Sequence, residues 1–211
     1  MPSSIRLCIP VILFVVLLAW PIAASAQRID TPSPEECRVG RRSLAALERL
    51  AATPSPVRAS PTPEGAKFVP PPGEPISPGA IAAITATQRG ALACANAGDR
   101  IRGMSLYSPD FIRRILADAA ASGLSVERIY DLFTPGGWVR PSDYVGILAV
   151  RDARLLPDGR IGAFFDVVTG NDPSVVETDF VFFVEVRGGW LIDDFVVVDI
   201  QFSDDLATPG R

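Results

Sequence analysis

The chain contains no histidine and only three cysteines among its 211 residues. The absence of histidine excludes a Ser-His-Asp triad, a Cys-His pair and the usual zinc ligand sets. There is no glycine-rich phosphate loop, and no acidic run has EF-hand spacing. We therefore expect neither a cofactor nor a metal. Basic residues are outnumbered, 20 against 24 acidic ones, which argues against a nucleic-acid partner, because such proteins carry a basic stripe.

The first 26 residues resemble a targeting segment. Arg6 precedes a nearly unbroken apolar run over residues 7–20, and Ala24-Ser25-Ala26 stands just before Gln27. This order of a basic start, an apolar run and a small-residue site predicts a secretory signal peptide cleaved after Ala26. The alternative is an uncleaved N-terminal membrane anchor, for which the run is at the short end of the ~20 residues that a span needs. We expect a secreted or extracytoplasmic protein of bacterial type.

Two cysteines remain once the signal segment is removed, because Cys8 lies inside it. In an oxidising compartment an even count favours a disulfide between Cys37 and Cys94. The bridge would close a loop of about 57 residues and stabilise the fold by roughly 4 kcal/mol in the chain-entropy model. The alternative is two free thiols.

Residues 27–76 form a proline-rich arm that is followed by a domain over residues 77–202 and a short tail over 203–211. Nine prolines fall within residues 53–79, a composition that favours extended polyproline conformation and does not build a core. Within the arm, residues 43–52 have the apolar spacing of a short helix, with Leu44, Leu47 and Leu50 on one side.

Three helices are predicted at the start of the domain. Ser77, Ser108 and Ser125 are capping residues, and proline follows the first two at the first helical position. The helices should end near residues 97, 123 and 134, where glycine or a Pro-Gly-Gly sequence follows.

Four strand-like runs follow, over residues 144–155, 160–168, 175–187 and 190–202, and short turn sequences join them. They predict an antiparallel meander. In the third run Phe180 and Phe182 share one face, while Asp179, Val181 and Phe183 share the other, which is more apolar than a solvated face needs. Helices followed by such a meander predict an α+β fold with the helices on one face of the sheet.

Three segments carry a family resemblance: Ala-Leu-Ala-Cys-Ala-Asn-Ala-Gly-Asp at 91–99, Leu-Tyr-Ser-Pro-Asp-Phe at 106–111 and Gly-Gly-Trp-Leu-Ile-Asp-Asp-Phe at 188–195. With them, the stretch from about residue 81 to 199 resembles the nuclear transport factor 2-like (NTF2-like) superfamily, which includes the SnoaL-like polyketide cyclases. The resemblance implies a cone, in which a curved sheet wraps on helices around a pocket. It carries structural motifs rather than an activity.

Ketosteroid-isomerase-like relatives use an aspartate base with a tyrosine and a protonated aspartate in an apolar cone. The resemblance therefore makes Tyr107, Asp166 and Asp194 candidates for the pocket, Asp194 on condition that no bulge moves it off the strand face of Trp190. The alternative is two surface acids and a tyrosine that only packs at a helix start. Trp138 and Trp190 either line the pocket or fill the core.

Two hypotheses for function follow. The first is a non-catalytic exported domain that binds a small apolar ligand in the cone or forms a homodimer through its sheet face. The second is a small enzyme of the isomerase or cyclase type that uses aspartate and tyrosine for acid-base chemistry.

Overall fold

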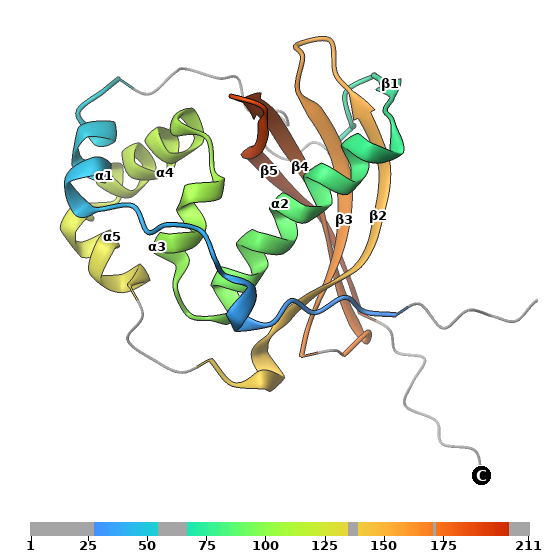
Figure 1. Cartoon of the computed structure of the whole chain (residues 1–211), viewed down its shortest axis with the longest axis horizontal. Helices are drawn as coiled ribbons and strands as arrows, with labels where there is room; N and C mark the ends of the chain where they lie inside the picture. The colour runs from blue at the N-terminus through green and yellow to red at the C-terminus, as the bar shows by residue number, and fades with distance from the viewer. Residues whose placement is uncertain (1–27, 55–66, 135–138, 171, 203–211) are drawn as a thin grey trace, which may run out of the picture.

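The computed structural model describes residues 28–54, 67–134, 139–170 and 172–202. They form one antiparallel sheet with helices on one of its faces (Figure 1). The strands follow one another in chain order, as β1 (Glu74–Pro75), β2 (Val145–Leu155), β3 (Ile161–Thr169), β4 (Val175–Val186) and β5 (Gly189–Phe202). The predicted α+β meander is confirmed, and the short β1 from the end of the proline-rich stretch adds a fifth strand.

The helices begin where the capping serines predict. Ser77, Ser108 and Ser125 each accept a hydrogen bond from the backbone N–H three residues on, which satisfies one of the unpaired donors at a helix start. The helices are α1 (Leu44–Ala51), α2 (Pro78–Asn96), α3 (Arg100–Gly103), α4 (Pro109–Ala121) and α5 (Val126–Phe133). In Figure 1, α2 crosses in front of the sheet, and α1, α4 and α5 form a separate group beside it.

The sheet face toward α2, which we call the inner face, holds the main core. Alternation along the strands places Ala163, Phe165, Val181 and Phe183 on it, and these side chains are buried with Ile84 of α2. In the sequence, this face of the third strand-like run was more apolar than a solvated face needs, although it also carries acidic residues. Val181 is only 1% exposed, so it lies beneath the helices and is not available to a second copy of the chain.

The opposite, outer face carries a second apolar cluster. Phe180 and Phe182 are buried there together with Leu156, and Phe68 covers them. The rings of Phe68 and Phe180 lie 5.2 Å apart between centroids. The stretch that contains Phe68 leads directly into β1, which pairs with β2. The end of the proline-rich stretch therefore closes part of the outer face.

The described residues before the proline-rich stretch pack on the helices. The predicted disulfide between Cys37 and Cys94 is confirmed and ties this segment to α2. Nearby, the amide of Asn96 donates to the carbonyl of Pro32 at 2.9 Å. Helix α1 inserts the fully buried Leu47 into a cluster with α4 and α5. A helix this short is stable only when its apolar face is packed against other parts of the protein.

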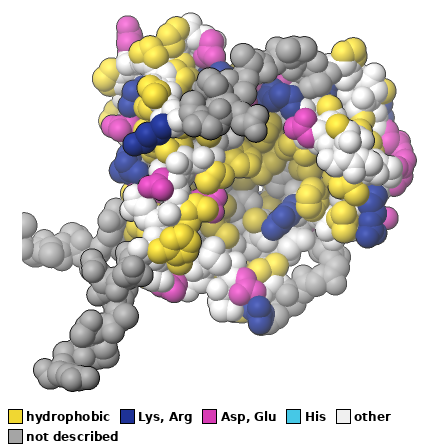
Figure 2. Space-filling view, turned by 180° about the vertical axis from the view of Figure 1, so that it is seen from behind, with side chains coloured by type: hydrophobic (Ala, Val, Ile, Leu, Met, Phe, Trp, Pro, Cys, Tyr) yellow, Lys and Arg dark blue, Asp and Glu magenta, His cyan; other side chains and the backbone are white. Residues whose placement is uncertain are grey.

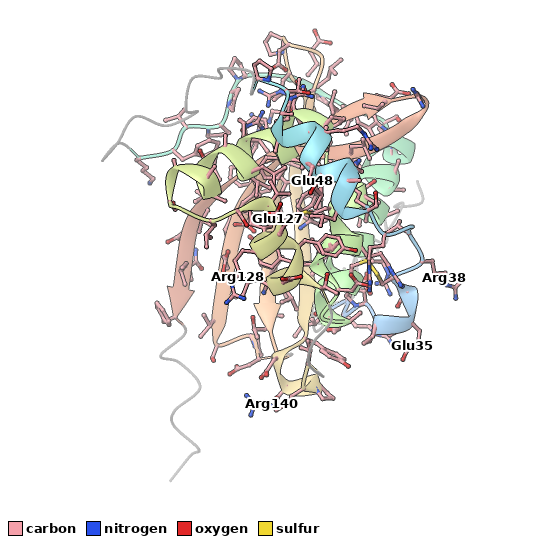
Figure 3. The ribbon with its side chains drawn as sticks, turned by 90° about the vertical axis from the view of Figure 1, so that its left-hand side faces the viewer. Glu35, Arg38, Glu48, Glu127, Arg128 and Arg140 are labelled. Atoms are coloured by element: carbon pink, nitrogen blue, oxygen red, sulfur yellow. A yellow bond between two sulfur atoms is a disulfide. The ribbon has the colours of Figure 1, made fainter. Side chains whose placement is uncertain are left out.

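The outer side of the helical group is charged. Glu48 of α1 and Glu127 and Arg128 of α5 lie on its surface (Figure 3). The predicted signal segment over residues 1–26 and the tail over 203–211 lie outside the described residues. Among the helices of the described ranges, none has the length and apolar character that crossing a membrane requires.

Candidate functional site

A pocket of about 610 Å³ lies between the helices and the inner face of the sheet. Its helical wall is contributed by α2 to α5 and the turn before α4: Gln88, Ala91, Leu92, Ala95, Arg100, Gly103, Met104, Tyr107, Ile115 and Phe133. Its sheet wall comes from β2 to β5: Val145, Val167, Thr169, Val175, Glu177, Asp179 and Phe195. Figure 2 shows a recess in the surface of the molecule, with hydrophobic side chains at its bottom.

The alternation of β4 explains how acidic side chains reach this pocket. Val175, Glu177 and Asp179 continue the same face that further along carries Val181 and Phe183. Val181 is sealed by the helices, whereas Val175 is 40% exposed. The helical cover therefore thins toward the start of β4, and the polar part of the strand faces a cavity instead of a packed core.

Asp179 is the most perturbed acid of the pocket. Burial raises the pKa of Asp179 from 3.8 to about 7, and the adjacent carboxyl of Glu177 adds to the rise. Its Oδ1 is buried and has no hydrogen-bond partner among the described residues. Neither Asp179 nor Glu177 forms an ion pair with any cation of the described chain. An acid in this state holds a proton over part of the neutral range. A side-chain hydrogen bond with Glu177 contributes to this raised pKa.

Two further polar side chains lie in the same cavity as Asp179. Gln88 of α2 is 9% exposed, and its buried Oε1 also lacks a partner among the described residues. Burial raises the pKa of the Tyr107 hydroxyl, although the charge of Arg100 opposes this rise. Gln88, Tyr107 and Asp179 also line an adjoining lobe of about 150 Å³, which reaches Val181 and Ile192.

One cationic side chain, that of Arg100, lines the helical wall of the pocket. Arg100, the first residue of α3, has its guanidinium 5.8 Å from the centroid of the Phe133 ring. Phe133 is the last residue of α5 and lines the pocket as well. The charges of the site are therefore divided, with the acids on β4 and one arginine stacked on an aromatic ring across from them.

Of the candidates from the sequence, the structure places Tyr107 in the pocket. Asp166 lies on the outer face of β3, where Arg151 donates to both of its carboxylate oxygens at 2.6 and 2.7 Å. Thr178 donates to it at 2.8 Å. Asp166 is thus a partnered structural acid and not a pocket residue, because residue 166 alternates with the inward-facing Phe165.

Asp194 leaves the inner face because of a β-bulge. The register shifts so that Phe183 pairs with Ile192 while Phe182 pairs with Asp194, which places Asp194 opposite an outer-face residue. There it pairs with Arg114 at 3.3 Å. Burial nevertheless raises its pKa, against the lowering charge of Arg114. The condition attached to this candidate, an unbroken alternation from Trp190, is not met.

The two tryptophan candidates have different outcomes. Trp190 packs partly buried against the inner-face core and does not line the pocket. Its carbonyl accepts a hydrogen bond from the Thr87 hydroxyl at 3.1 Å, which ties the start of β5 to α2. Trp138 lies outside the described residues.

Three pocket residues were not predicted from the sequence: Gln88, Glu177 and Asp179. A signal was present in β4, since its acidic face also carried Val181 and Phe183 and was too apolar for a solvated surface. Nothing local distinguishes Gln88 from a surface glutamine, because its burial depends on where α2 crosses the sheet.

The arrangement offers acceptors, one tyrosine and one arginine in a largely apolar cavity. The described ranges contain no cluster of three or more cysteine, aspartate or glutamate side chains that could hold a metal ion. No protein-family model, no curated protein and no solved structure matches the chain.

Proposed function

We propose that the pocket between α2 and β4 binds a small amphipathic ligand. The observation that carries this proposal is a cavity of about 610 Å³ in which two buried acceptors, Gln88 Oε1 and Asp179 Oδ1, have no partner among the described residues. A buried acceptor left unpaired destabilises a fold by about 1–3 kcal/mol. A ligand that donates to both would recover this free energy.

The size and lining of the cavity support the same proposal. Small-molecule sites typically span ~300–1,000 Å³ and combine apolar walls with a few convergent polar groups. Here Leu92, Ile115, Val167 and Phe195 supply apolar contacts. The proposal also agrees with the resemblance to the NTF2-like superfamily, whose members enclose a pocket between a curved sheet and helices. We regard membership of that superfamily, and export behind a cleaved signal peptide, as parts of this proposal.

The experiment measures binding of N-phenyl-1-naphthylamine, a neutral apolar dye whose fluorescence rises in apolar surroundings. We expect saturable binding of one dye to the wild-type protein. Ala95→Phe fills the pocket from α2, and we expect it to weaken binding at least ~10-fold, about 1.4 kcal/mol. Ala86→Phe is the matched control, because Ala86 is exposed on the same helix and does not line the pocket.

Circular dichroism melting of each variant establishes that it is folded. If Ala95→Phe does not fold, Leu92→Trp replaces it, since the half-buried Leu92 lines the same wall. The proposal is wrong if the wild-type protein shows no saturable dye binding, or if the pocket variant binds as well as the control.

A second function rests on Asp179 and Tyr107 together. A carboxyl whose pKa lies near 7 is suited to general acid-base catalysis at neutral pH, and Tyr107 lines the same lobe. This is the isomerase-type chemistry of the second hypothesis, now with Asp179 in place of Asp166 and Asp194. Its test is exchange of the α-hydrogens of 4-phenyl-2-butanone in deuterated water, followed by NMR. Exchange that Asp179→Asn abolishes would favour the enzyme, and exchange at the buffer rate would exclude it for this ketone.

A further inference from the structure

We infer that the ligand of this pocket carries a primary or secondary ammonium group, which the acceptors on β4 and α2 bind while an apolar body lies along the remaining walls. This inference rests on the proposed function and names the chemical class of the ligand.

Among the described residues, the buried polar atoms of the pocket that lack a hydrogen-bond partner are all acceptors. Gln88 Oε1 and Asp179 Oδ1 are buried acceptors without partners among the described residues, and they line the same lobe. Glu177 adds further acceptor oxygens two positions along the same face of β4. Acceptor groups facing one cavity favour a ligand with several N–H or O–H donors, and an ammonium nitrogen has two or three on one atom.

The charge of the pocket selects among such donors. Glu177 and Asp179 form no ion pair within the described ranges, so above about pH 7, where Asp179 is ionised, no cation of these residues balances their charge. Arg100 lies on the helical wall, where its guanidinium is 5.8 Å from the ring centre of Phe133. A ligand cation placed at β4 would relieve the repulsion between the two acids, whereas a neutral alcohol would not.

The remaining lining sets the shape of the ligand. Phe195 is 46% exposed and Val175 is 40% exposed, although both line the pocket. They form the apolar rim outside the acids. The ligand is therefore an amine whose charged end reaches Asp179 and whose hydrocarbon or aromatic part lies against Phe195 and the helical wall, where burial of apolar surface adds affinity.

The experiment compares three probes with one carbon skeleton, each used to displace N-phenyl-1-naphthylamine from the full chain. They are 4-phenylbutylamine, 4-phenylbutan-1-ol and 4-phenylbutyl-trimethylammonium. At pH 8 we expect the primary amine to bind at least ~10-fold more tightly than the alcohol, as a charged hydrogen bond of ~1.5–3 kcal/mol predicts. The quaternary ion keeps the charge but has no N–H donor, and we expect it to bind more weakly than the primary amine.

The dependence on pH provides a second readout. Protonation of Asp179 below about pH 7 removes one negative charge from the site, while the probe amine stays charged. The preference for the amine over the alcohol should therefore shrink from pH 8 to pH 5.5. Glu177, Tyr107 and Arg100 are the other titratable or charged groups that face the pocket.

Variants assign the effect to named residues. Asp179→Asn should lower amine affinity at least ~10-fold and leave affinity for the alcohol nearly unchanged. Glu185→Gln is the matched control, because Glu185 is an exposed acid of the same strand outside the pocket, and it should change neither.

Equal binding of amine and alcohol by the wild-type protein at pH 8 would overturn the inference, as would a quaternary ion that binds as tightly as the primary amine. An equal loss of amine and alcohol in Asp179→Asn would overturn it as well. In each of these cases the proposed function still stands if dye binding is blocked by Ala95→Phe. If no probe and no dye binds, the proposed function itself fails.

Discussion

Asp166 and Asp179 are acids on neighbouring strands, one register step apart, and they face opposite sides of the same sheet. On the outer face, Arg151 and Thr178 donate to Asp166. Burial alone would raise the pKa of Asp166, but these hydrogen bonds and the charge of Arg151 lower it overall. On the inner face, burial and Glu177 raise the pKa of Asp179 to about 7.

The comparison shows that burial of an acid does not by itself identify a binding site. Asp166 is 8% exposed and is more buried than Asp179, yet its hydrogen bonds are made within the protein. Asp179 borders a cavity and its Oδ1 remains unpaired. On the outer face, the charge of Asp166 is thus balanced within the protein by Arg151. On the inner face, the described residues provide no hydrogen-bond partner for Asp179 Oδ1, which a ligand could supply.

The largest effect should come from opening the outer face with Phe68→Ala. Phe68 is 8% exposed and packs on Phe180, and removal of a buried phenylalanine ring destabilises a protein by about 3 kcal/mol. Urea unfolding measures the loss. Val69→Ala is the control, because Val69 is 75% exposed and should change the free energy of unfolding by less than about 0.5 kcal/mol. Equal effects of the two changes would mean that the end of the proline-rich stretch does not close this face.

Asp166→Asn should cause the next largest change in the free energy of unfolding. It leaves Arg151 without its anionic partner, and since the Arg151 side chain is 50% exposed, we expect a loss of about 2 kcal/mol rather than the full penalty of a buried charge. The pKa of Asp166 is lowered in the folded protein, so its stabilisation is present above the ordinary pKa of aspartate and is lost as pH falls through the folded value. The difference between variant and wild type should accordingly disappear in acid. A difference that persists at low pH would contradict the ion-pair explanation.

Asp179→Asn should have the opposite effect and increase the free energy of unfolding. Because the pKa of Asp179 is raised from 3.8 to about 7, the folded protein binds a proton that the unfolded chain releases, and this acid lowers stability as pH rises from about 4 to 7. For a fully desolvated group the change would be roughly 4 kcal/mol, and solvent screening in the open pocket reduces the expected gain of the variant to about 1.5 kcal/mol.

Thermal or urea unfolding at pH 8 and at pH 4 checks this expectation. The gain should be present at pH 8 and absent near pH 4. Asp199→Asn is the control, since Asp199 is exposed on β5. A destabilised Asp179→Asn protein at pH 8 would show that Asp179 has an internal partner and would remove the contrast with Asp166.

The smallest effect is expected for Gln88→Met. Methionine keeps the length of the side chain and removes the unpaired Oε1, so the free energy of unfolding should rise by up to about 1 kcal/mol. Calorimetric melting measures it, and Gln201→Met is a control at an exposed glutamine. A stability loss would indicate that the Gln88 amide is satisfied within the protein.

The elements themselves were predictable from local chemistry. The capping serines at 77, 108 and 125 begin the three main helices, and the turn sequences separate the four long strands. The Cys37–Cys94 bridge was predicted from the count of cysteines and the expected compartment. The site was predicted only at Tyr107. Asp194 does not face the pocket because a β-bulge moves it to the outer face, and Asp166 does not because the alternation of β3 places it there as well.

The sequence alone determined that the chain has no histidine chemistry, where the three main helices and the four long strands lie, and that these strands form an antiparallel meander, because these follow from composition, caps, turns and periods of a few residues. Only the tertiary structure decided which face of β4 the helices cover, and where their cover ends. A period of two defines two faces of a strand but not which of them is packed. Asp179 and Gln88 border one cavity because α2 crosses the sheet at one place and leaves the start of β4 open.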